Sequence, residues 1–254
     1  MTKSKLLDTL IIILFYIGLS SIPFDWLKIS ETLKLIFSVL TQLVIFILIR
    51  LILKKSPLKL KERTHNKTNL ILFIPLFLLC FSNFFTLLQP ENTFTFSFSF
   101  NLLLGILLSL CVAINEEYIF RMILIDNLDD SEKPNIKILI AASIFAACHL
   151  THFFSTFDPS TLAIVGYTFF LGIILGFIYV YGGSFYYCVL FHFAYNTFND
   201  SFASFINPGI RDLAYYLINI GVGVMVALYL FLIYIFKIRL KDKNLSKENE
   251  QEKV

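Results

Sequence analysis

Apolar stretches long enough to cross a lipid bilayer recur along most of the chain. A spanning helix needs about 20 mainly apolar residues. In lipid each span must satisfy its own backbone hydrogen bonds, so these stretches predict helices and not open strands. The eight stretches lie at about 6–22, 33–53, 70–88, 101–125, 136–153, 162–181, 184–198 and 213–236. The pattern predicts an all-α polytopic membrane helical bundle with about eight transmembrane helices.

Composition supports a membrane protein and excludes an ordinary water-soluble enzyme. The 254 residues are 57% hydrophobic and only 15% charged, with a mean hydropathy of +0.76, whereas soluble domains carry about 25% charged residues. The formal net charge of +3 is too small to indicate nucleic acid. Since all four cysteines lie in apolar runs, we expect no disulfide.

Basic residues mark one side of the bundle. The loop after the second stretch, about 54–67, and the tail after residue 236 are rich in Lys and Arg, whereas 89–100 and 154–160 contain neither. Short cytoplasmic loops collect Lys and Arg. We therefore expect a multi-pass protein of the cell membrane with both termini cytoplasmic.

Several polar side chains interrupt these apolar stretches, and they fall mainly on three of the predicted helices. A charge at mid-span costs about 2.5–3.5 kcal/mol on insertion scales, so such a residue is a functional-site hypothesis by default. The fourth helix carries Glu116, Glu117 and Arg121, the fifth carries His149, and the seventh carries His192 and Asn196.

Depth and spacing allow these residues to share one buried site. Counting about 1.5 Å per residue from the cytoplasmic ends, Glu116, His149 and His192 lie about 13, 20 and 12 Å deep. Residues four apart share a helix face, so Glu117 faces Arg121, while Glu116 is turned by about 100°. We expect a structural Glu117–Arg121 ion pair, with Glu116 free to face the histidines. Taken singly, each group also fits a plain structural role.

Three motifs resemble those of the membrane-embedded CAAX proteases and bacteriocin-processing enzymes, the CPBP or Abi family. EExxxR stands at 116–121, FxxxH at 145–149 and HxxxN at 192–196. The resemblance covers about 102–198. It implies a catalytic core at 101–199. The apolar and charged stretches add three further segments: 1–100 with helices one to three and a basic cytoplasmic loop, a last helix at 200–237, and a charged tail at 238–254.

The resemblance implies hydrolysis of a peptide bond inside the bilayer. Glu116 would act as general base on water, and His149 would hold and polarise that water. His192 and Asn196 would donate hydrogen bonds to the oxyanion. Phe145 would pack and orient its helix. The expected partners are the lipid bilayer and a membrane-associated peptide or lipidated protein substrate, with roles in bacteriocin or pheromone maturation or in self-immunity.

Other readings remain open. Glu116, His149 and His192 match the ligand count of a catalytic zinc site. No HExxH is present, however, so we expect no cofactor and keep zinc as the alternative. A non-catalytic immunity or scaffold protein would use the same residues to hold the bundle. A proton-coupled carrier would use them as a relay, although no internal repeat supports it.

Within the sixth helix, Gly172 and Gly176 form a GxxxG pattern, which lets a neighbouring helix approach closely. We expect this close contact to lie inside the molecule and not between two copies of it. Directly after this helix, Gly182 and Gly183 leave almost no connection to the next one, which predicts a tight hairpin or a re-entrant pair.

Overall fold

The structure is a computed structural model that describes residues 3–22, 24–56, 58, 60, 73–81, 99–129, 132–151, 160–202 and 213–234. Within these ranges the chain is helical and contains no strand, which confirms the predicted all-α class. The α-helices are α1 (Lys3–Ser20), α2 (Glu31–Leu53), α5 (Phe100–Glu117), α6 (Pro134–Cys148), α8 (Ser160–Gly182), α9 (Phe185–Asn196) and α11 (Leu213–Ile233).

Four shorter helical segments complete the described chain. Two are 3-10 helices, η1 (Phe24–Leu27) and η2 (Ile74–Phe81), and two are π-helical, η3 (Tyr118–Ile125) and η4 (Thr197–Phe202). Of the predicted third span, 70–88, only 73–81 is described. Most of the basic loop, the outward-facing stretches 89–98 and 154–159, and the charged tail lie outside the described residues.

Serine side chains begin three of the helices. Ser30, Ser99 and Ser184 each accept a hydrogen bond from a backbone N–H three residues later, at 3.4, 3.2 and 3.3 Å. Such N-caps satisfy amide groups that have no partner inside the helix. Each cap therefore fixes where α2, α5 and α9 start.

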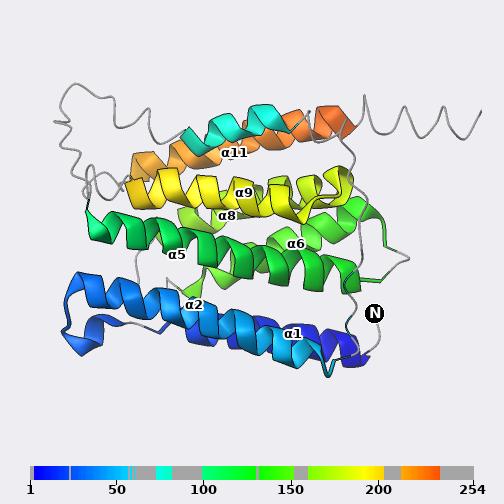
Figure 1. Cartoon of the computed structure of the whole chain (residues 1–254). Helices are drawn as coiled ribbons and strands as arrows, with labels where there is room; N and C mark the ends of the chain where they lie inside the picture. Colours follow the sequence, from blue (N-terminus) through cyan, green and yellow to red (C-terminus); the bar gives the residue numbers. More distant parts are fainter. Residues whose placement is uncertain are drawn as a thin grey trace, which may run out of the picture.

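The helices run side by side, with α5 at the centre (Figure 1). It packs against α2 on one side and α9 on the other, while α6 packs against α8 and α8 against α11. α1 contacts α2 and η3. The buried amide of Asn115 joins α5 to α2, because its Nδ2 donates to the backbone carbonyl and to Oε1 of Gln42 at 2.9 and 2.7 Å.

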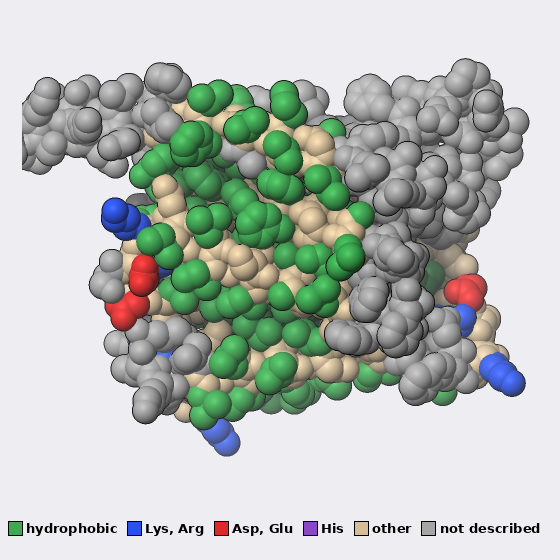
Figure 2. Space-filling view, turned by 180° about the vertical axis from the view of Figure 1, so that it is seen from behind, with side chains coloured by type: hydrophobic (Ala, Val, Ile, Leu, Met, Phe, Trp, Pro, Cys, Tyr) green, Lys and Arg blue, Asp and Glu red, His purple; other side chains and the backbone are tan. Residues whose placement is uncertain are grey.

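Apolar side chains cover the middle of the surface seen in Figure 2, and charged side chains gather toward the two ends of the bundle. Large apolar residues are exposed along several helices, among them Leu14, Leu162 and Met225. Among the described residues, three helical stretches, Glu31–Leu53, Phe100–Ile125 and Leu162–Gly182, are long and apolar enough to cross a membrane. A surface of this kind is stable against lipid and not against water, so this is a membrane protein.

Glycines bring α8 against α6, as the GxxxG pattern predicts. A Cβ on Gly172 would lie 2.9 Å from Cα of Ala142 and 3.3 Å from the Phe145 ring, and one on Gly176 would lie 2.7 Å from Cγ2 of Ile138. The close approach is within the molecule. The next connection is tight, because Gly183, at φ 66°, directly precedes the Ser184 cap of α9.

We predict that Gly172→Ala destabilises the bundle by about 1–3 kcal/mol, the usual cost of overpacking. The added methyl meets backbone at Ala142, which cannot rotate away. Gly221→Ala is the matched control, since a Cβ there meets nothing within 4 Å. Thermal unfolding in detergent checks both variants. Equal stability of the two would show that α8 does not need its glycine against α6.

Candidate active site

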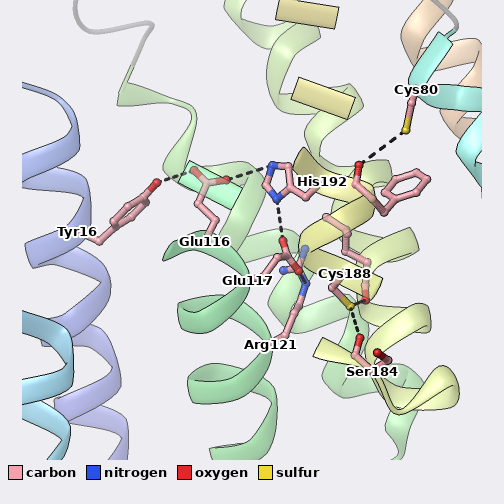
Figure 3. A network of polar contacts seen from close by, with 10 residues as sticks. Tyr16, Cys80, Glu116, Glu117, Arg121, Ser184, Cys188 and His192 are labelled. Atoms are coloured by element: carbon pink, nitrogen blue, oxygen red, sulfur yellow. Dashed lines mark hydrogen bonds and ion pairs between the residues drawn. The ribbon is translucent and has the colours of Figure 1, made fainter. Parts of the chain in front are cut away.

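The imidazole of His192 lies between the two carboxylates of α5 (Figure 3). Its Nδ1 is 2.8 Å from Oε1 of Glu117, and its Nε2 is 3.5 Å from Oε2 of Glu116. All three residues are at most 8% exposed. The structure thus joins the first and third sequence motifs through one histidine.

Glu117 contacts two partners. Its Oε2 lies 3.0 Å from Nε of Arg121, and both side chains are fully buried, so the expected ion pair is present. Its Oε1 accepts the hydrogen bond from Nδ1–H of His192. The spacing of residues in the sequence predicted only the ion pair with Arg121 for Glu117. The second contact fixes the ring orientation and directs Nε2 toward Glu116.

Phe145 packs among the charged groups. Its ring centroid is 6.0 Å from that of His192, 5.0 Å from that of His149, and 5.2 Å from the guanidinium carbon of Arg121. An aromatic face stabilises a buried cation. Phe145 therefore contacts both imidazoles and the guanidinium.

His149 is half-buried at the carboxyl end of α6. Its Nδ1 lies 3.0 Å from the backbone carbonyl of Phe145 and must donate, because a carbonyl only accepts. This bond fixes the ring and makes Nε2 the acceptor nitrogen of the neutral form. His149 thus shares with His192 of the cluster a contact with the ring of Phe145.

Asn196, the last residue of α9, is half-buried and lies four residues after His192. Among the residues that the structure describes, its amide has no hydrogen-bonded contact with Glu116, Glu117 or His192. Its expected part in stabilising an oxyanion therefore stays a prediction.

Tyr16 of α1 is a member of the site that sequence reasoning missed. Its hydroxyl donates to Oε1 of Glu116 at 2.7 Å, and the residue is 4% exposed (Figure 3). The chain has 12 tyrosines. Nothing in its local sequence distinguishes this one, and the three motifs lie far from it along the chain.

Two of the helices that carry motif residues, α5 and α9, change to π-helix at the site. η3 begins directly after Glu117, and η4 begins directly after Asn196. A π-turn takes an extra residue, and single π-turns in other proteins are frequent at functional sites. Arg121 therefore reaches Glu117 from a wider turn than the α-helical spacing assumed.

The zinc alternative requires Glu116, His149 and His192 to converge on one ion. In the described ranges, no three His, Cys, Asp or Glu side chains are gathered closely enough to hold a metal. His192 also directs Nδ1 to Glu117. These donors do not fit a three-ligand zinc site.

Residues 97–198 match the family model described as type II CAAX prenyl endopeptidase Rce1-like. The matched segment contains all three motifs and confirms the resemblance drawn from them. No curated protein and no solved structure matches the chain.

We predict that Arg121→Gln destabilises the protein by about 3–5 kcal/mol, because it removes the cation beside a buried carboxylate. The double variant E117Q/R121M is expected to cost less than this single change, since no buried charge is left unpaired. Glu31→Gln breaks the exposed Glu31–Lys34 pair and should cost under about 1 kcal/mol. Denaturant titration in detergent compares the three. If Arg121→Gln were as mild as Glu31→Gln, the buried pair would not stabilise the bundle.

Proposed function

We propose that this membrane protein is a CAAX-protease-like intramembrane endopeptidase that uses water activated by Glu116. The observation that carries the proposal is the buried Glu116 carboxylate, 3.5 Å from a histidine that a second carboxylate orients. The match of the surrounding segment to the CAAX prenyl endopeptidase model supports the reaction class.

Glu116 is the proposed general base. Its Oε2 takes a proton from water while the water oxygen attacks the carbonyl carbon of the substrate peptide bond. The carbonyl oxygen becomes an oxyanion in this step. When the tetrahedral intermediate collapses, the C–N bond breaks and Glu116 returns the proton to the leaving nitrogen.

His192 is the proposed oxyanion donor. Protonated at both nitrogens, its ring donates to Glu117 through Nδ1 and presents Nε2–H to the oxyanion. In this form Arg121 and His192 together balance the two carboxylates, so the buried cluster carries no net charge. A donor fixed in a dry site stabilises developing charge more strongly than water does. Asn196 is assigned as a further donor to the oxyanion, and His149 as the group that holds the water, whose hydrogen bond its Nε2 accepts.

The proposed substrate is a membrane-associated peptide or a lipidated protein. The exposed apolar surface supports a site reached from the bilayer. Maturation of a bacteriocin or pheromone, or self-immunity, is the role proposed from the resemblance to bacterial family members. The distribution of Lys and Arg supports a multi-pass arrangement in the cell membrane with both termini cytoplasmic.

We predict that Glu116→Gln lowers kcat/KM by about 100-fold or more, the usual contribution of a general base. The assay uses purified protein in lipid vesicles with a fluorogenic peptide ending in a prenylated Cys-aliphatic-aliphatic-X sequence, and in parallel an unprenylated amphipathic peptide. Glu132→Gln, which changes an exposed carboxylate, is the control and should keep the wild-type rate.

Wild-type cleavage by Glu116→Gln would contradict the proposal and favour a scaffold in which the polar residues only hold the bundle. A chelator arm separates the two enzyme mechanisms. The glutamate mechanism keeps its rate in chelator, whereas a zinc-dependent one loses it and regains it on addition of Zn²⁺.

A further inference from the structure

We propose that Tyr16 is a positioning residue for Glu116, so that α1 completes a site whose other members all lie in the family-matched segment. This inference rests on the proposed function. Tyr16 stands 100 residues before Glu116 and outside the matched segment 97–198. Only the packing of α1 brings its side chain to the catalytic carboxylate.

The buried face of α1 delivers Tyr16 to the cluster. Thr9, Ile12, Ile13 and Tyr16 are buried, at spacings that place them on one side of the helix. The opposite side exposes Leu7, Leu10 and Leu14. α1 packs through its buried side on α2 and η3, the π-helical segment that follows the two glutamates.

The Tyr16 hydroxyl binds one carboxylate oxygen of Glu116 and leaves the other oxygen for the reaction. Oε1 of Glu116 accepts its hydrogen bond at 2.7 Å, while Oε2 lies 3.5 Å from Nε2 of His192. A carboxylate held at one oxygen by a donor cannot rotate freely about its last bond, and a hydrogen bond to a charged acceptor is strong. Tyr16 thus aims Oε2 at the histidine and leaves that oxygen without the tyrosine donor.

In the part of the chain that the structure describes, four groups act on the Glu116 charge. These are Tyr16 from α1, His192 from α9, Cys148 from α6, which interacts electrostatically with it, and Glu117 next to it in the chain. Tyr16 is the one that contributes a neutral hydroxyl donor. Removing this hydroxyl withdraws stabilisation from the ionised carboxylate without adding or removing a formal charge.

The structure offers a matched control for this bond. Tyr179 is also buried, and its hydroxyl donates to Oδ2 of Asp126 at the same 2.7 Å. Both tyrosines join two helical segments through a buried carboxylate. Asp126 is not part of the Glu116–His192 cluster, so this second bond shares the structural role and not the catalytic one.

We predict that Tyr16→Phe lowers kcat by about tenfold to 100-fold, the loss expected for one hydrogen bond to a charged group. KM should change little, because Tyr16 contacts Glu116 and not the substrate. The acidic limb of the kcat/KM profile should move to higher pH, since the ionised base has lost a donor. Tyr179→Phe should leave kcat and the pH profile as in the wild type.

A second variant keeps the test decisive if Tyr16→Phe folds poorly. 3-Fluorotyrosine at position 16 preserves the ring and makes the hydroxyl a stronger donor, so the acidic limb should move to lower pH. An unchanged profile in both Tyr16 variants would overturn the proposal. So would a loss of kcat that Tyr179→Phe reproduces.

Glu116→Gln, measured with the same vesicles and peptide, separates this inference from the proposed function. If Glu116→Gln abolishes cleavage while Tyr16→Phe matches the wild type, the endopeptidase stands and the role of Tyr16 falls. If Glu116→Gln itself cleaves normally, the proposed function fails and this inference fails with it.

Discussion

A histidine held between two carboxylates, inside a bundle of apolar helices, is the contact on which the site depends. His192 reaches Glu117 at 2.8 Å and Glu116 at 3.5 Å, with all three residues buried. Charges in such surroundings are costly unless they are paired. The contacts of His192 therefore pair polar groups of α9 with the carboxylates of α5. They also fix the position of the two helices relative to each other.

The packing of the surrounding helices supports the contact between His192 and the two carboxylates. Arg121 balances Glu117 from the same helix, and Phe145 of α6 covers the guanidinium and both imidazoles. Gly172 lets α8 pack closely against α6, the helix that carries Phe145. On the other side of α5, the Asn115–Gln42 bonds and the Tyr16 hydroxyl tie the site to α2 and α1. Tyr16 of α1 and His192 of α9 thus contact the two carboxylates directly, whereas Gln42 of α2 holds the neighbouring Asn115.

Much of this could be predicted from the sequence, because lipid imposes simple rules. Apolar length predicts the all-α class, and charges inside apolar stretches identify Glu116, Glu117, Arg121 and His192. The spacing of four residues predicts the Glu117–Arg121 pair, and the GxxxG pattern predicts the approach of α8. These signals are local or depend only on composition.

Contacts between distant helices could not be predicted in the same way. Helical phase says which way a side chain points and not what it meets, so the second partner of Glu117 and the hydroxyl of Tyr16 left no local signal. The change to π-helix after Glu117 was not predicted either, since nothing in the sequence Tyr118–Ile125 distinguishes the wider turn. These features arise from packing between elements.

The most direct test is a double-mutant cycle on kcat/KM with Glu117→Gln, His192→Gln and the two combined, assayed in lipid vesicles. If Glu117 acts by orienting His192, the double variant will be no slower than His192→Gln alone, because the two residues work as one unit. If the two losses multiply instead, Glu117 and His192 act independently, and the account of a histidine positioned between two carboxylates is wrong.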